Sequence, residues 1–171
     1  MKRAFACLLS AAIVAHAAAF AGPAAAAEAP FGFAWSARPD SLPRASSMVA
    51  DANFLVLVYE GATVPPAMKD TQAVALSVCG RHGLQQVRWV SRIFSLSAGI
   101  KKFVDIYEAG VERYGEADQA DLDKGVAAWS AQHVGMRLDR VGEAGFHIVM
   151  ISDGPQFDEC QDEHRRMIGP R

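Results

Sequence analysis

Apolar and polar residues alternate along several short stretches of the chain, as they do on strands with one buried face. The densest apolar run, 53–60, reads NFLVLVYE and has the length and composition of a strand. In 72–79, Val74, Leu76 and Val78 share one face, and smaller residues occupy the other. A turn at 80–83 leads into 84–92, so the two segments predict a hairpin with a four-residue loop.

A helical period replaces this alternation after residue 96. We expect a helix over about 97–114, with Ser97 as its N-cap and Gly115 at its C-terminal end. Charged residues lie mainly on its outer side, so the apolar face should pack on a sheet. The apolar positions that share that face are Ile100, Phe103, Val104, Tyr107, Val111 and Tyr114.

The remaining sequence predicts an acidic loop at 116–125, then strands in 126–131, 134–141 and 145–152. A short C-terminal helix is expected after Pro155. The order of strands, helix and strands is typical of an α+β fold. We predict an antiparallel sheet of about five to six strands, with one main amphipathic helix packed on a face and the short C-terminal helix.

The N-terminal segment has the layout of a secretory signal peptide. A basic start at 1–3 precedes an uncharged stretch of about 17 residues, and Ala25, Ala26 and Ala27 offer a small-residue cleavage site. The alternative is an uncleaved membrane anchor, but this alanine-rich stretch is at the lower limit of bilayer-spanning length. We therefore divide the chain into a signal peptide at 1–27, an irregular arm at 28–48 and one α+β domain at 49–171. Prolines exclude a helix through the arm, and Phe31, Phe33 and Trp35 should attach it to the core.

Export changes how charge and cysteines are interpreted. The 171 residues carry a net charge of −2, and removal of 1–27 leaves 15 basic and 19 acidic residues, or −4. Such a surface has no general attraction for nucleic acid, and stable membrane insertion after cleavage is not expected. Cys79 and Cys160 would be the two remaining cysteines, and in an oxidising compartment we predict that they form a disulfide. Two buried free thiols are the alternative.

Known catalytic motifs are missing from the sequence. It contains no G-x-S-x-G, H-E-x-x-H, phosphate-binding glycine loop or C-x-x-C. Cys79 with His82 could form a nucleophile pair, but half of a disulfide beside a turn histidine explains the same residues better. We therefore name no catalytic residue and no cofactor.

Acidic residues crowd the C-terminal segment. Asp158, Asp162 and His164 are weak candidates for a metal site, because carboxylates and imidazole bind divalent cations. The alternative, which we favour, is a solvated helix face whose first acidic residues complement the helix dipole. His133 and His147 could bind zinc with a carboxylate, but their spacing matches no known ligand pattern.

Three stretches have a familiar appearance: VCGRHGLQQVRWVSR from Val78, FVDIYEAGVERYGEAD from Phe103, and the lone Trp129 before the alternating strands. In these features the chain resembles small exported bacterial proteins of unknown function. The resemblance covers about half of the chain after residue 27. It implies the fold and a place in the bacterial envelope, and no residue role.

Two functions are compatible with these observations. The first is a periplasmic or secreted protein without catalysis that binds a protein or small-molecule partner or assists in the envelope. The second is a small secreted hydrolase or metal-dependent enzyme with an unrecognised active site. A pocket that gathers His133, His147 or Asp153 would favour the enzyme, and a flat sheet face with an apolar patch would favour binding.

Signal cleavage can be tested directly. We expect the exported protein to begin at Glu28, because the small-residue site ends at Ala27. Intact mass spectrometry of the exported protein measures this. A form that retains Lys2 and Arg3 would contradict the prediction.

Overall fold

One eight-stranded antiparallel sheet, in the order β1-β2-β3-β4-β8-β7-β6-β5, forms the body of the computed structural model. The structure describes residues 28–64 and 69–169; the predicted signal peptide lies outside them. The strands are β1 Ser47–Asp51, β2 Phe54–Glu60, β3 Thr71–Cys79, β4 Gly83–Ser91, β5 Gln119–Asp121, β6 Val126–Trp129, β7 Val134–Val141 and β8 Gly145–Asp153. The helices are α1 Leu96–Tyr114 and α2 Phe157–Ile168, with short 3-10 helices at Pro30–Gly32, Pro39–Ser41, Gly61–Thr63 and Ser130–Gln132.

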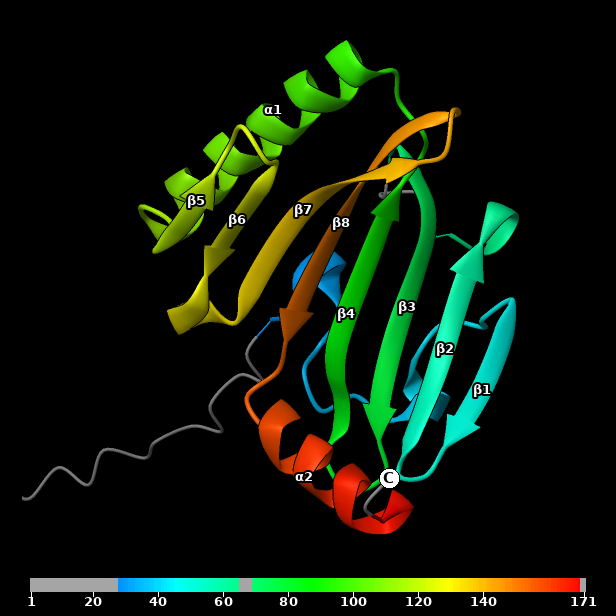
Figure 1. The fold of residues 1–171 in the computed structure, drawn as a ribbon. Helices are drawn as coiled ribbons and strands as arrows, with labels where there is room; N and C mark the ends of the chain where they lie inside the picture. The colour runs from blue at the N-terminus through cyan, green and yellow to red at the C-terminus, as the bar shows by residue number, and fades with distance from the viewer. Residues whose placement is uncertain (1–27, 65–68, 170–171) are drawn as a thin grey trace, which may run out of the picture.

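The sheet consists of two four-stranded meanders, β1–β4 and β5–β8, that meet where β4 pairs with β8 (Figure 1). Each meander is built from neighbouring antiparallel pairs, as the alternating sequence predicts. The predicted α+β class, antiparallel sheet and two helices are confirmed. The predicted strand number is wrong, because the sheet has eight strands and not five to six.

The two additional strands, β1 and β5, lie at the edges of the sheet. All five residues of β1 are exposed, so that no alternation of apolar and polar side chains marks it. Part of β1 falls in the predicted arm, whereas β5 has only three residues and falls in the predicted acidic loop. Edge strands pair on one side only, and their sequences therefore carry a weaker pattern than central strands do.

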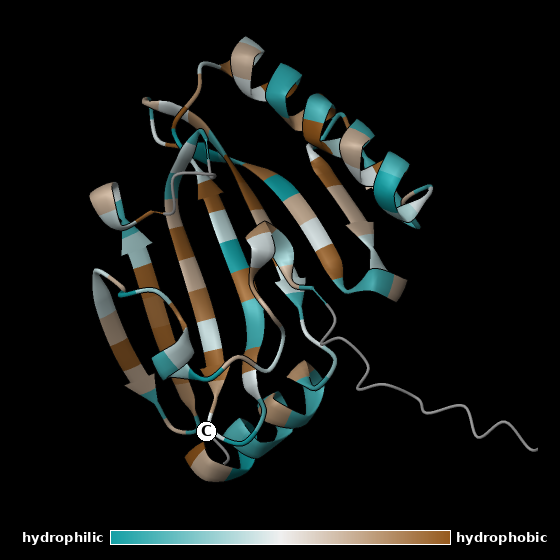
Figure 2. Ribbon diagram, turned by 180° about the vertical axis from the view of Figure 1, so that it is seen from behind, coloured by the Kyte–Doolittle hydropathy of each residue, from teal (hydrophilic) through white to brown (hydrophobic). Residues whose placement is uncertain are grey.

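Helix α1 covers one face of the sheet, over β7 and β8 (Figures 1 and 2). Phe103 is buried, and Tyr107 and Tyr114 each stack on Trp129 with ring centroids 5.8 Å apart. The indole of Trp129 also donates a hydrogen bond to Gly115 O at 2.8 Å. Most of the predicted apolar face therefore packs on the sheet, as expected.

Two details of the predicted helix are wrong. Ile100 is 46% exposed, because the buried side of the first turns runs through Gly99 and Phe103, and Ile100 lies at the edge of that side. A Cβ on Gly99 would contact Phe146 and Leu138, so the helix already packs on the sheet at this turn. The N-cap is Ser95 rather than Ser97, so the helix begins at Leu96.

The arm packs on the same face as α1, over the first meander. Phe33 and Trp35 are buried, but Phe31 is 39% exposed, so only two of the three expected aromatic anchors are inserted in the core. Ser36 N donates to Leu84 O at 3.0 Å, and Leu84 N donates to Ala37 O at 2.9 Å. These two hydrogen bonds attach the arm to the start of β4.

The predicted disulfide is confirmed: Cys79 at the end of β3 is bonded to Cys160 in α2, with Cα atoms 6.1 Å apart. Asn53 reinforces this contact, because its Nδ2 donates to Cys160 O at 2.9 Å. The bridge holds α2 across the ends of the strands of the first meander. No helix among the described residues has the length and apolar character needed to cross a membrane.

Two apolar residues of α1 that the sequence pattern places on one face, Phe103 and Ile100, should contribute unequally to the free energy of unfolding. Phe103→Ala should lower the free energy of unfolding by about 3–5 kcal/mol, because it leaves a cavity under the helix. Ile100→Ala, on the same helix and largely exposed, should cost no more than about 0.5–1 kcal/mol. Urea denaturation measures both variants, and equal losses would contradict the assigned packing.

Candidate functional site

On the side of the sheet opposite α1, neither α1 nor α2 covers β4, β8, β7 and β6 (Figure 1). This part of the sheet carries an apolar surface that includes Val126, Ala128, Val149 and Ile151. We call this surface the open face. Side chains alternate along each strand, and cross-strand register then aligns them in rows. One row consists of Val58, Ala75, Arg88, Ile151, Gly135 and Ala128. The next consists of Ala73, Val90, Val149, Arg137 and Val126.

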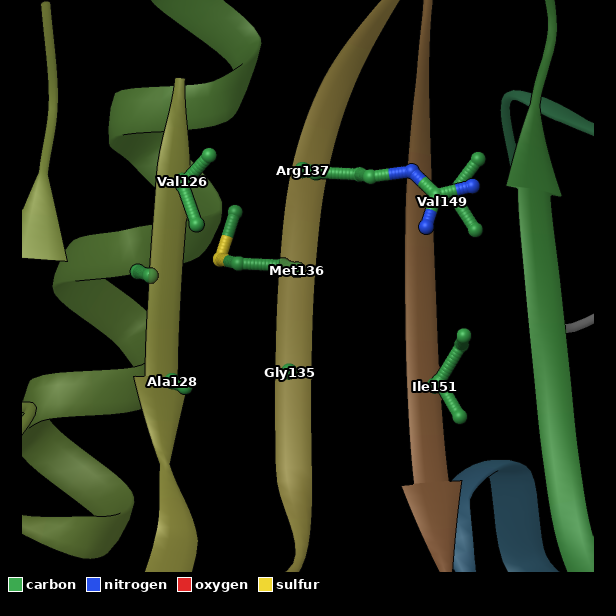
Figure 3. Close-up of a pocket in the computed structure, with 8 residues that line it drawn as sticks. Val126, Ala128, Gly135, Met136, Arg137, Val149 and Ile151 are labelled. Atoms are coloured by element: carbon green, nitrogen blue, oxygen red, sulfur yellow. The ribbon is translucent and has the colours of Figure 1, made fainter. Parts of the chain in front are cut away.

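A shallow hollow of about 200 Å³ lies in these rows on the second meander. Gly135 has no side chain, and a Cβ added to it would meet no atom of the described residues within 4 Å. Val126, Ala128 and Ile151 surround this open space, as Figure 3 shows. The hollow is therefore a result of a glycine placed in the middle of an otherwise aliphatic row.

Two arginines interrupt the aliphatic rows. Arg137 lies across Val149, which is only 4% exposed although it faces the open side (Figure 3). Its Nε donates to Asp139 Oδ2 at 2.7 Å, and this carboxylate is also 3.8 Å from His147 Nε2. Arg88 lies between Ala75 and Ile151 and is exposed. Among the described residues, Arg88 makes no ion pair.

The cations of the open face are all arginines. The four lysines after residue 27 lie on α1 or in loops: Lys69, Lys101, Lys102 and Lys124. Arginine is enriched in the cores of protein interfaces and lysine is depleted, because guanidinium is weakly hydrated and its flat surface packs on apolar groups. In its aliphatic residues and arginines, the open face is similar in composition to the core of protein interfaces.

The weak metal candidates point in different directions. Asp162 pairs with Arg165, one turn further along α2. His164 contacts Asn53 Oδ1 through Nδ1 at 3.2 Å and faces Asp51 at 3.7 Å, whereas Asp158 is exposed in the first turn. Residues two apart on an α-helix project about 200° apart, which separates Asp162 from His164. In the described ranges, no three His, Cys, Asp or Glu side chains form a group that could hold a metal ion.

Of the other candidates, His133 and Asp153 are neighbours, because Asp153 N donates to His133 O at 2.9 Å, whereas His147 is kept apart from both. His147 and Asp153 belong to β8 and are six residues apart, or about 20 Å along a strand. His147 lies beside Asp139 at one end, and Asp153 receives a hydrogen bond from Gln86 Nε2 at 2.8 Å at the other. His82 faces Glu159 at 3.8 Å, near the disulfide that occupies Cys79.

Sequence reasoning missed Arg88, Gly135 and Arg137 as parts of one surface. The alternation in each segment was visible, but the rows exist only after β4 pairs with β8 and β7 with β6. Comparison of this chain with protein-family models, curated proteins and solved structures finds no match.

Asp153 predicts a measurable pH dependence. Burial raises the pKa of this carboxyl, and the Gln86 hydrogen bond offsets only part of that effect. The folded state therefore binds more protons than the unfolded state above about pH 4, where an ordinary Asp loses its proton, and stability falls as pH rises through the raised pKa. Asp153→Asn should remove this loss and make the protein more stable at pH 7.

Urea denaturation at pH 4 and pH 7 measures the effect of Asp153→Asn. Asp123→Asn, in an exposed turn, controls for the loss of one negative charge. If the two variants change the difference between pH 4 and pH 7 equally, burial of Asp153 does not cause the pH dependence.

Proposed function

We propose that this chain is an exported binding protein without catalysis, and that its open face binds a partner protein. The single observation that carries the proposal is the pair of arginines inside an uncovered aliphatic sheet face. The partner surface would be apolar at its centre and would carry carboxylates opposite Arg88 and Arg137. The disulfide supports the oxidising compartment that export supplies.

Apolar burial would supply most of the attraction. Val126 is 44% exposed, and its neighbours Ala128, Gly135 and Ile151 are partly exposed around the hollow. Small and branched side chains form a surface with little conformational entropy to lose when a partner covers it. The hollow above Gly135 would accept one projecting apolar side chain.

The arginines would set the choice of partner. Arg88 and Arg137 lie on strands separated by β8, and hence about 10 Å apart across the sheet. Arg137 is already compensated in part by Asp139, whereas Arg88 makes no ion pair within the described ranges. A partner carboxylate would therefore gain the most binding free energy if it lay beside Arg88, and a basic partner would be repelled there.

A second copy of this chain fits the open face less well. In a symmetric dimer the same patch meets itself, which would bring the arginines of both copies to one interface. The enzyme alternative has less support from the described residues, because His147 lies at the opposite end of β8 from the neighbouring pair Asp153 and His133. A heterologous acidic partner is the proposal that uses both the aliphatic rows and the charges.

Site-specific photocrosslinking in cells that express the full chain tests the proposal. A photoreactive residue replaces Val126 on the open face or, as the control, Ile100 on α1, two positions with 44% and 46% exposure. We expect a discrete adduct with one other protein from position 126 only. The same adducts from both positions, or an adduct between two copies of this chain, would overturn the proposal.

A charge reversal makes this experiment specific. Arg88→Glu should reduce the adduct about tenfold or more, because it places a carboxylate opposite the partner's carboxylates. Arg140→Glu changes the charge equally at the exposed end of β7, on the other face, and should leave the adduct unchanged. If Arg88→Glu has no effect on the adduct, the charge argument is wrong.

A further inference from the structure

A second hollow, on the covered side of the sheet, lies between the arm and α1 and measures about 220 Å³. We call it the arm–helix cleft. Phe31 forms its wall on the arm side, and Ala109, Arg113 and Tyr114 form the wall on the α1 side. Its floor is made by Trp129, Val134, Met136, Met150 and Ser152.

The α1 side of the cleft is held in place by a close contact between helix and sheet. A Cβ on Gly110 would lie 2.4 Å from Trp129 Cη2, so only glycine permits this approach. Trp129 is 2% exposed and fixed by its hydrogen bond to Gly115 O. This wall and part of the floor are therefore preformed, which lowers the entropic cost of binding.

The arm side of the cleft carries an unusual aromatic residue. Phe31 has a φ of +66°, a left-handed conformation that is costly for a bulky side chain. Its ring is 39% exposed although it lies 6.4 Å from the ring of Trp89. A ligand that covered the ring would remove this exposure, and burial of an aromatic side chain is strongly favourable.

Two polar residues lie at different depths of the cleft, one at its rim and one on its floor. Arg113 is exposed at its rim, its guanidinium 5.4 Å from the ring centroid of Tyr114, and it makes no ion pair within 28–64 and 69–169. Ser152 is 5% exposed and contributes to the floor at the opposite strand, β8. The cleft thus combines aromatic walls, one cation at the mouth and one hydroxyl-bearing residue inside.

We propose that the arm–helix cleft binds a small aromatic carboxylate. The ring would lie among Phe31, Tyr114 and Trp129, where edge and face contacts between aromatic groups are available. The carboxylate would pair with Arg113, whose planar guanidinium suits two-oxygen anions. A cavity of about 150 Å³ can hold benzene, so this volume accommodates one ring with a short acidic tail. The site is separate from the open face and does not depend on its partner.

Three ligands of nearly equal shape test the charge preference: 3-phenylpropanoate, 3-phenylpropan-1-ol and 3-phenylpropylamine. Each is titrated into the ¹⁵N-labelled protein, purified from cells that express the full chain, and is followed by NMR and calorimetry. We expect 3-phenylpropanoate to bind about tenfold more tightly than the alcohol, and the amine to bind weakest. The Trp129 indole N–H and the amides of Ala109 and Ser152 should shift.

Two variants separate the role of Arg113 from the shape of the cleft. Arg113→Gln should reduce the affinity for 3-phenylpropanoate about tenfold, to that of the alcohol, and should leave binding of the alcohol unchanged. Arg166→Gln, at an exposed position of α2 that does not line the cleft, is the matched control and should change neither. Ala109→Trp should fill the cleft and weaken both ligands, while unchanged amide shifts away from α1 verify that this variant is folded.

The proposal is overturned by any of three results. These are equal affinity for the acid, the alcohol and the amine, an Arg113→Gln variant with unchanged preference, or shifts confined to the open face. Absence of binding at the solubility limit of 3-phenylpropanoate overturns it as well. Because the photocrosslinking experiment examines the other side of the sheet, either proposal can fail without the other.

Discussion

The pairing of β4 with β8 is the interaction on which the rest of the structure depends. Five residue pairs, from Gln86 opposite Asp153 to Val90 opposite Val149, join two meanders that are otherwise separate sheets. Buried polar side chains extend this seam at both ends. Ser91 Oγ accepts a hydrogen bond from Ile148 N at 2.8 Å, and Gln85 Oε1 accepts one from Gln156 N at 2.9 Å. Loss of either acceptor would leave a buried donor unpaired, which is more costly than the bond itself is stabilising.

The seam also explains why the sheet has one covered and one open face. The chain leaves β4 through α1, which must return across the sheet to reach β5 at the far edge. On the way it buries Phe103 and partly buries Tyr107 and Tyr114. The arm covers the first meander on the same side. Helix α2 starts where β8 ends and is bonded to β3 through Cys160, so it remains at the strand ends. The open face is what these three connections leave uncovered.

The sequence predicted those features that depend on neighbours along the chain. The hairpin of β3 and β4, the main helix and the short last helix follow from local periodicity. The disulfide was predicted from the cysteine count together with the expected export. The edge strands β1 and β5 were missed because exposed residues carry no alternation. Ile100 was misplaced because the buried side of the first turns is centred on Gly99 and Phe103, and a glycine adds nothing to an apolar pattern. Neither candidate site was predicted, since Arg88 meets Ile151, and Phe31 meets α1, only through pairings between distant segments.

The two proposed sites lie back to back on the same strands. Along β8, Val149 and Ile151 face the open side, whereas Met150 and Ser152 form the floor of the arm–helix cleft. Along β7, Gly135 produces the hollow on one side and Met136 supports the cleft on the other. Because successive side chains of a strand point to opposite faces of the sheet, one pair of strands contributes to two surfaces of different chemistry. If a ligand in the cleft influenced the open face, the effect would have to pass through β7 and β8, because these paired strands lie between the two surfaces.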